Sequence, residues 1–199
     1  MSIATRSWAL VVGYLLGTVP SADIATRLAA GTGRNLRSEG SGNPGAFNAA
    51  VTLGRRWGAA VLIADMAKGA AAGRLGRAIA GPAGGYLAGS AAIAGHIAPV
   101  WSRGRGGKGV ATSAGACLTV FPAYFPIDAV VAVASAAVGR DAERAIRVSC
   151  AAWIIAAVVW WRAKLPNLWG PPPTGGLPAF AVAGSAMIVT KFRMSRVAR

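Results

Sequence analysis

The sequence predicts an all-α integral membrane protein with seven transmembrane helices, some of them short or re-entrant. Of its 199 residues, 54% are hydrophobic and only 14% are charged, whereas a soluble domain carries about a quarter charged residues. The hydrophobic residues lie in long blocks rather than along one periodic stripe, and basic residues gather at the ends of these blocks. We expect residues 1–199 to form a single polytopic membrane domain.

The predicted helices follow seven apolar blocks, at residues 7–30, 56–74, 80–101, 110–121, 124–138, 147–163 and 177–190. A helix crosses the hydrocarbon core with about 20 residues, so the first three blocks are long enough. The block at 7–30 follows Arg6 and resembles a signal peptide, but the spans after it favour a first membrane span. The fourth and fifth blocks are short and are separated by "FPAYFP". They predict either two abbreviated or re-entrant helices or one kinked helix, because proline interrupts helical hydrogen bonding.

Basic residues decide between six and seven spans. With seven spans, one side of the membrane receives 14 basic residues and the other receives 5. The larger group comprises Arg34, Arg37, Arg55, Arg56, Arg103, Arg105, Lys108, Arg140, Arg144, Arg147, Lys191, Arg193, Arg196 and Arg199. With six spans this bias disappears. The positive-inside rule therefore predicts seven spans, with the N-terminus outside and the C-terminus in the cytoplasm.

The net charge of +15 would suggest a nucleic-acid partner in a soluble protein. Here topology and anionic lipid headgroups account for most of it, so we expect contact with the bilayer and no nucleic-acid binding. Cys117 and Cys150 both fall in apolar blocks without metal-ligand spacing, and we expect no metal site. Glycine pairs at small-xxx-small spacing, such as Gly69 and Gly73, indicate close helix packing.

Two glycine-rich loops fall on the predicted cytoplasmic side. They are "EGSGNPGAFNAA" at residues 39–50 and "GHIAPVWSRGRGGKGVAT" at residues 95–112. Unobstructed backbone N–H groups can form concavities that hold anions, and Lys108 would place an ammonium beside them. A helix that starts near Gly109 would add its N-terminal N–H groups. This pattern predicts a phosphate site, and a flexible basic loop that touches lipid phosphates is the alternative.

Three other polar residues stand in or beside apolar blocks. His96 is the single histidine of the sequence and sits at the end of the third block. A polar group at membrane depth is costly and is usually functional, so we expect His96 to act in the site. Asp65 and Lys68 are three residues apart in the second block and share one helical face. We expect them to form a structural ion pair.

These residues alone leave an enzyme and an anion transporter both open. The motifs "GSGNPGAFNA" (40–49), "DMAKG" (65–69) and "GHIAPVWSRGRGGKGVAT" (95–112), in this order, resemble the PlsY family of acyl-phosphate:glycerol-3-phosphate acyltransferases. The resemblance implies a multi-pass protein of the bacterial inner membrane with its active face in the cytoplasm. It implies transfer of a fatty acyl group from acyl phosphate to the 1-hydroxyl of glycerol 3-phosphate, which gives lysophosphatidate and phosphate without a cofactor.

The resemblance also implies roles for individual residues. Catalytic roles fall on Ser41, His96 and Lys108, and substrate binding on Asn43, Asn48, Gly106, Gly107, Gly109, Thr112 and Arg55. Val51 stands where the family usually has an arginine, which Arg55 or Arg56 would replace one turn later. The C-terminal "KFRMSRVAR" lacks the histidine, glutamate and asparagine usual there. A non-catalytic paralogue that binds anionic lipid or a partner is therefore an alternative, and other enzymes of phospholipid synthesis are possible partners.

Overall fold

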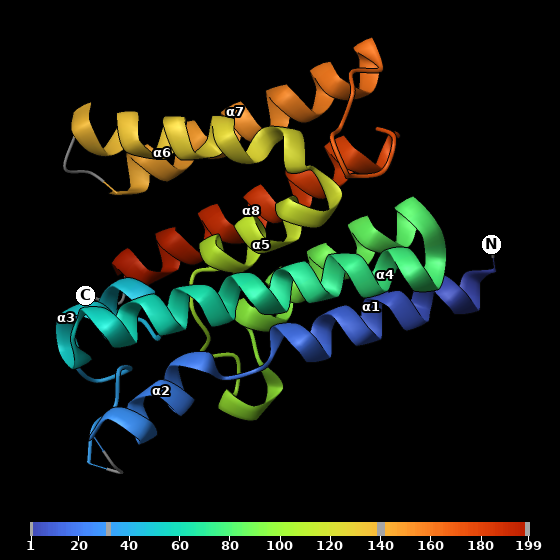
Figure 1. The fold of residues 1–199 in the computed structure, drawn as a ribbon. Helices are drawn as coiled ribbons and strands as arrows, with labels where there is room; N and C mark the ends of the chain where they lie inside the picture. The colour runs from blue at the N-terminus through green and yellow to red at the C-terminus, as the bar shows by residue number, and fades with distance from the viewer. Residues whose placement is uncertain (1, 31–32, 139–141, 198–199) are drawn as a thin grey trace.

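The computed structural model describes residues 2–30, 33–138 and 142–197, and within these ranges every regular element is helical (Figure 1). The helices are α1 (Ile3–Gly17), α2 (Ser21–Ala30), α3 (Ala46–Leu53), α4 (Arg55–Ile97), α5 (Val110–Val120), α6 (Phe125–Val138), α7 (Ala142–Ala163) and α8 (Gly176–Val197). Short 3-10 turns lie at Val100–Ser102 and Pro122–Tyr124. The predicted all-α fold is confirmed.

The first apolar block forms two helices, and the prediction of one continuous helix over 7–30 is wrong. The chain leaves the helix after Gly17 and starts α2 at Ser21. Pro20 has no N–H to continue the helical ladder, so a break at this point costs little. The N–H of Thr18 is still satisfied by Tyr14 O at 3.0 Å, and its hydroxyl donates to Leu15 O at 2.7 Å. The break leaves polar backbone between α1 and α2, in the middle of an otherwise apolar stretch.

Helix α4 is a hairpin of two helical segments. Its backbone leaves helical geometry at Ala80 and Gly81, where Gly81 has φ 58°. This left-handed conformation favours glycine. The two segments then pack so closely that a Cβ at Gly76 would lie 2.3 Å from the carbonyl oxygen of Gly84. The hairpin, visible where the chain turns back in Figure 1, corresponds to the predicted blocks 56–74 and 80–101.

The "FPAYFP" segment also separates two helices. The axes of Val110–Val120 and Pro122–Val131 differ by 120°, so α5 and α6 are distinct segments rather than one kinked helix. Three-residue 3-10 geometry at Pro122–Tyr124 makes the turn. Of the two interpretations that the sequence left open, the structure has the one with two short helices.

Small residues bring the helices together. On α1, Cβ atoms at Gly13 and Gly17 would lie 2.3 Å and 2.2 Å from the carbonyl oxygens of Ala88 and Ala92 on α4. The predicted packing role of Gly69 is confirmed, because a Cβ there would lie 2.1 Å from Thr112 O on α5. Backbones that approach this closely gain dispersion contacts that larger side chains would prevent. The glycines therefore fix α1 and α5 on opposite parts of the α4 hairpin.

Loop contacts collect at two ends of the bundle. At one end Arg37 Nε donates to Arg105 O at 3.0 Å, and Lys191 Nζ donates to Ile97 O at 3.4 Å. At the other end Arg77 donates to Thr119 O at 2.9 Å and also to Trp169 O. This grouping of the loops agrees with the grouping that the positive charges predict. Arg140 and Arg199, which were counted at the first end, lie outside the described residues.

Within the described residues, two helical segments are long and apolar enough to cross a membrane, Ile3–Ala29 and Glu143–Ala163. The bent pair α5 and α6 adds a third if it is taken as one span. The α4 hairpin does not reach this hydropathy, because it carries Asp65, Lys68, Arg74 and Arg77 among alanines and glycines. The predicted seven crossings and their orientation stay predictions.

Candidate active site

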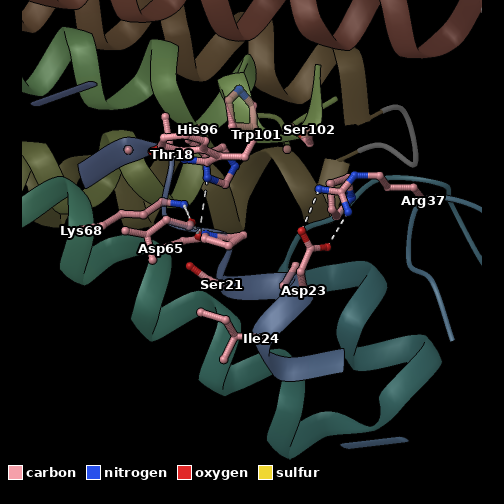
Figure 2. Close-up of a pocket in the computed structure, with 18 of the residues that line it drawn as sticks. Thr18, Ser21, Asp23, Ile24, Arg37, Asp65, Lys68, His96, Trp101 and Ser102 are labelled. Carbon is pink, nitrogen blue, oxygen red and sulfur yellow. Dashed lines mark hydrogen bonds and ion pairs between the residues drawn. The ribbon is translucent and has the colours of Figure 1, made fainter. Parts of the chain in front are cut away.

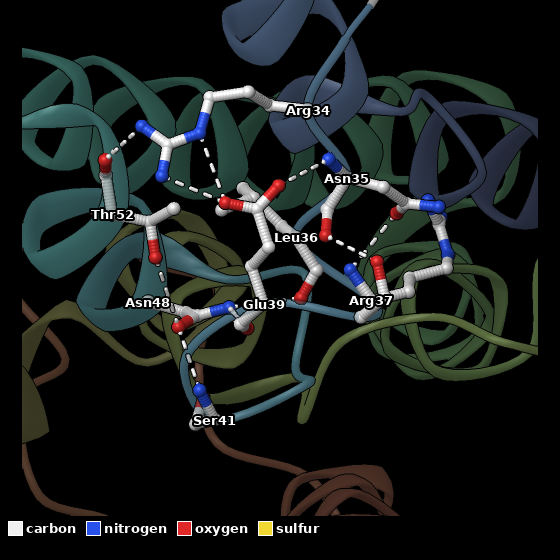
Figure 3. A network of polar contacts seen from close by, with 9 residues as sticks. Arg34, Asn35, Leu36, Arg37, Glu39, Ser41, Asn48 and Thr52 are labelled. Atoms are coloured by element: carbon white, nitrogen blue, oxygen red, sulfur yellow. Dashed lines mark hydrogen bonds and ion pairs between the residues drawn. The ribbon is translucent and has the colours of Figure 1, made fainter.

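The first loop is organised by the side chain of Asn48, which is 1% exposed at the start of α3 (Figure 3). Its Nδ2 donates to Leu36 O at 2.9 Å and to Glu39 O at 3.0 Å, while its Oδ1 accepts the Ser41 N–H at 2.9 Å. One amide thus ties three points of the loop to α3. Both hydrogens of the Asn48 amide are used inside the protein, and the substrate-binding role expected of Asn48 stays a prediction.

A second anchor of the same loop is the carboxylate of Glu39. It accepts the Asn35 N–H at 2.8 Å and pairs with Arg34, whose Nη2 lies 2.7 Å from Oε2. The Asn35 hydrogen bond, followed by that from Arg34, lowers the pKa of Glu39 below its ordinary value. Arg34 continues to Thr52 O at 2.9 Å, so this network closes the loop onto the end of α3.

The second loop does not form the expected N–H nest at its glycines. The Gly106 N–H donates to Ile97 O and the Gly107 N–H donates to His96 O, both at 3.1 Å. These two N–H groups are therefore used within the protein, and the substrate-binding role expected of Gly106 and Gly107 stays a prediction. The glycines serve another purpose: a Cβ at Gly107 would lie 2.3 Å from His96 Nε2. They allow the loop to lie directly against the imidazole.

Lys108 and the first turn of α5 follow these glycines. Gly109 has φ 85° and is the N-cap residue of α5, which confirms the predicted helix start. The Lys108 ammonium lies 4.1 Å from the centre of the Phe192 ring on α8, a cation–π contact. Lys108 therefore stands between the N-terminal end of one helix and the C-terminal part of another, where an anion would meet a positive charge and a helix dipole.

Asp65 lies at the centre of a buried polar cluster. Its Oδ1 is 2.8 Å from Lys68 Nζ and 3.5 Å from His96 Nδ1, and all three residues are at most 7% exposed. The predicted ion pair of Asp65 and Lys68 is present. Lys68 Nζ also donates to Val19 O at 3.0 Å, and so reaches the break between α1 and α2. The helical spacing of Asp65 and Lys68 predicted their contact, but it did not reveal that His96 joins them.

The larger of two cavities beside this cluster has a volume of about 660 Å³. One part of its wall is polar and contains Ser41, Asn43, Asn48, Asp65, His96, Lys108, Glu143 and Ser195. Another part is apolar and contains Phe47, Leu62, Met66, Val110, Ala111, Ala114 and Phe192. The cavity thus offers a charged region and an extended hydrophobic region to one ligand.

Two expected substrate-binding residues stand apart from both cavity walls. Thr112 is fully buried where α5 packs against Gly69 of α4. Arg55 is exposed at the first residue of α4. Gly109 does line the larger cavity, whereas Gly106 and Gly107 line the smaller one. The structure therefore brings together Ser41, Asn43, His96 and Lys108, but it leaves Thr112 and Arg55 outside.

The smaller cavity, about 230 Å³ in volume, lies on the other side of Asp65 and His96 (Figure 2). The break between α1 and α2 forms one wall, from Gly17 to Ile24, and the loop with Trp101 and Ser102 forms another. Trp101 Nε1 donates to Thr18 Oγ1 at 3.0 Å across this space. Sequence reasoning did not find this cavity, although Asp23 within an apolar block was a signal for it.

An ion pair closes one side of the smaller cavity. Arg37, from the first loop, contacts both carboxylate oxygens of Asp23 on α2, with Nη2 3.1 Å from Oδ2. The same guanidinium donates through Nε to Arg105 O at 3.0 Å. Arg37 therefore joins α2, the first loop and the second loop at one point.

The chain matches the family model "Glycerol-3-phosphate acyltransferase" over residues 7–197. A glycerol-3-phosphate acyltransferase of Bacillus cytotoxicus is 40% identical over 150 residues, which are 75% of each chain. One of Rhizobium meliloti is 41% identical over 159 residues, which are 80% of this chain and 77% of that one. The fold is similar to crystal structures of PlsY, an integral membrane glycerol 3-phosphate acyltransferase, in its glycerol 3-phosphate and lysophosphatidic acid forms. The TM-score is 0.77 for both, with 27% and 25% identity, over 95% of this chain and 88% of PlsY.

Proposed function

The chain belongs to the glycerol-3-phosphate acyltransferase family, and from this we propose that its larger cavity transfers an acyl group from acyl phosphate to the 1-hydroxyl of glycerol 3-phosphate. The protein is a membrane acyltransferase of phospholipid synthesis with an all-helical integral membrane fold. The products of the proposed reaction are lysophosphatidate and inorganic phosphate.

The observation that carries this proposal is the position of Lys108 in the larger cavity. Its ammonium and the start of α5 at Gly109 belong to the polar region, and Leu62, Met66 and Ala114 belong to the apolar region of the same wall. An acyl phosphate has this division, with a dianionic head on a hydrocarbon chain. Lys108 and the helix N-terminus would hold the phosphate, and the apolar residues would cover the first carbons of the chain.

The reaction would proceed by direct transfer. The 1-hydroxyl oxygen of glycerol 3-phosphate attacks the acyl carbonyl carbon, the bond from that carbon to the phosphate oxygen breaks, and phosphate leaves. The hydroxyl proton passes to His96 Nε2 and from there to the departing phosphate. Because His96 turns Nδ1 toward Asp65, Nε2 is the ring nitrogen left for this exchange. Ser41 and Asn43 would orient the acceptor, and Lys108 would stabilise the charge that develops on the phosphate.

The C-terminal part of α8 supports this site although it lacks the residues that the family usually has there. Phe192 and Ser195 both line the larger cavity. Phe192 also contacts the Lys108 ammonium. Val51, by contrast, is 67% exposed on α3 and is not part of the cavity wall. We therefore propose that the site binds and positions substrate without an arginine at position 51.

Turnover by purified protein in phospholipid nanodiscs would test the function. Acyl phosphate and glycerol 3-phosphate are supplied without coenzyme A or carrier protein, and lysophosphatidate and phosphate are both quantified. We expect the two products in equal amounts. Absence of lysophosphatidate above background, while a competent family member reacts under the same conditions, would reject the proposal in favour of a non-catalytic paralogue.

We further propose seven membrane crossings in an inner membrane, with the N-terminus outside and both glycine-rich loops in the cytoplasm. The contacts of Arg37 with Arg105 and of Lys191 with Ile97 support a common side for these loops and the end of α8. Cysteine labelling in intact cells tests this on a background without Cys117 and Cys150. Pro172→Cys, between α7 and α8, should react with an impermeant maleimide, and Ser38→Cys should react only after lysis. The reverse pattern would reject the orientation.

A further inference from the structure

We propose that the smaller cavity is a second phosphate site, which binds a small phosphate oxyanion separately from the larger cavity. Its wall combines the break between α1 and α2 with the buried Asp65, Lys68 and His96 cluster. Figure 2 shows these groups around one space, with Ser21 below the cluster and Ser102 above it. Ser21, Ser102, Arg27 and Arg37 line the smaller cavity and are not among the residues that line the larger one.

Two hydroxyl groups in this wall have no hydrogen-bond partner among the described residues. They are the Oγ atoms of Ser21 and Ser102, both buried. Ser21 is 8% exposed as a residue and opens α2 directly after Pro20. A buried polar group without a hydrogen-bond partner lowers the stability of the folded protein. Both residues line the smaller cavity, and we infer that a ligand with acceptor oxygens there is the missing partner of these hydroxyl groups.

The charges of the wall favour an anion. Three cations, Arg27, Arg37 and Lys68, face two carboxylates, Asp23 and Asp65. Both carboxylates are already engaged, Asp23 by Arg37 and Asp65 by Lys68. Each carboxylate in the wall is therefore neutralised by a paired cation. The three cations exceed the two carboxylates by one positive charge. Ser21 also begins the ten-residue helix α2, whose N-terminal dipole adds to the attraction.

The volume of the smaller cavity limits the size of the anion that it can hold. Its 230 Å³ corresponds to about eight water molecules at roughly 30 Å³ each. Inorganic phosphate or a short phosphate monoester fits in this space, whereas a fatty acyl chain does not. The wall is shared with the larger cavity at Asp65 and His96, which line both. If the proposed acyl transfer is correct, the departing phosphate is released beside this site, and this last step alone rests on the proposed function.

Binding of inorganic phosphate to the purified full-length protein, measured by calorimetry in nanodiscs, tests the second site. We expect Lys108→Gln, which alters the larger cavity only, to retain phosphate binding. In this background Ser21→Ala should weaken the affinity about tenfold, since a hydrogen bond to a charged group is lost. Ser185→Ala is the matched control, because Ser185 is also a buried serine but lines neither cavity.

A second variant keeps the test independent of the buried serine. Arg27 is exposed on α2, so Arg27→Gln should leave the fold intact, weaken phosphate binding and reduce its dependence on salt. Arg6→Gln, an exposed arginine on α1 outside the cavity, should leave binding unchanged. Two results would overturn the proposal. One is equal phosphate affinity of Ser21→Ala, Arg27→Gln and their controls Ser185→Ala and Arg6→Gln. The other is complete loss of phosphate binding when Lys108→Gln is the single substitution.

Competition then distinguishes the source of the phosphate. Glycerol 3-phosphate that displaces inorganic phosphate in a Ser21-dependent manner would show that the site accepts a monoester, and failure to displace it would restrict the site to free phosphate. Turnover is measured separately, on the wild type and on Ser21→Ala with Lys108 intact. Turnover without Ser21-dependent binding rejects this site and leaves the proposed function standing, whereas binding without turnover does the opposite.

Discussion

His96 presents its Nδ1 to Asp65 Oδ1 at 3.5 Å, and this contact forms the wall between the two cavities. The carboxylate is 3% exposed and also holds the Lys68 ammonium at 2.8 Å. A single buried carboxylate thereby contacts a ring that lines both cavities and a cation that reaches the α1–α2 break. Removing its charge should affect both the stability of the bundle and the activity of the site.

Asp65→Asn should lower the free energy of unfolding by about 3–5 kcal/mol, because it leaves the buried Lys68 ammonium without its counter-ion. The double variant Asp65→Asn/Lys68→Met should recover much of this loss, since it removes the unpaired charge. Thermal unfolding in detergent, compared among the wild type and both variants, measures the effect. Equal stability of Asp65→Asn and the wild type would show that the pair contributes nothing.

Lys108→Gln should reduce kcat for acyl transfer by about 10²–10³, the usual effect of removing one group that stabilises transition-state charge. The unfolding temperature should change little, because the residue is only partly buried. Lys164→Gln, at an exposed lysine near the opposite end of the bundle, serves as the matched control and should retain full activity. A Lys108→Gln enzyme with unchanged kcat would remove Lys108 from the mechanism.

Gly107→Ala should impair activity, because the added Cβ would lie 2.3 Å from His96 Nε2 and must displace the loop or the ring. Gly33→Ala is the comparison, since no heavy atom lies within 4 Å of a Cβ at that position. Activity at saturating substrate and the unfolding temperature should fall for the first variant only. If both variants behave like the wild type, the second loop does not hold His96 in place.

Asn48→Asp should destabilise the first loop by about 1–3 kcal/mol for each unsatisfied carbonyl, because the carboxylate cannot donate to Leu36 O and Glu39 O. Thr52→Val removes only the 3.4 Å contact to Asn48 Oδ1 and should cost much less. Chemical denaturation gives the free energies of both variants. A small effect of Asn48→Asp would mean that Asn48 faces substrate rather than holding the loop.

Loss of order in the first loop should accompany acidification. Because the folded-state pKa of Glu39 lies below the ordinary value of 4.5, its contribution to stability is fully present above that value and is lost as the pH falls through the folded-state pKa. Amide exchange of residues 34–42 in the wild type should accelerate when the pH falls below the folded-state pKa of Glu39. In Glu39→Gln the loop should exchange rapidly at neutral pH and show no such transition.

Apolar blocks and turn residues predicted most of the helices, because membrane helices are apolar over their length and Gly and Pro interrupt them. Helix α3 (Ala46–Leu53) was not predicted, because it lies between two blocks and begins within the glycine-rich loop at residues 39–50. The blocks at 110–121 and 124–138 agree with α5 (Val110–Val120) and α6 (Phe125–Val138) within a residue. The break at Thr18–Pro20 was missed, because Pro20 is also compatible with a kink inside one span. Length and hydropathy do not distinguish these two cases.

Contacts between distant segments account for the errors at the site. Glycine-rich sequence predicted free N–H groups at Gly106 and Gly107, but the end of α4 lies close enough for its carbonyls to accept both. The resemblance placed Asn48 at the substrate, but it did not reveal that its amide donates to the backbone of the first loop. The partnership of Asp23 with Arg37 joins residues that are 14 positions apart across a turn, and no local pattern encodes it.

The glycine contacts between α1, α4 and α5 have a consequence for protein engineering. Replacing a helical glycine by alanine commonly raises stability by about 0.4–1 kcal/mol, because it restricts the unfolded chain. At Gly13, Gly17 and Gly115 the new methyl group would lie within 2.3 Å of a neighbouring carbonyl oxygen. A consensus or thermostabilisation programme that treats these positions as weak helix formers would separate the helices. The useful targets are instead the exposed positions that face lipid or solvent.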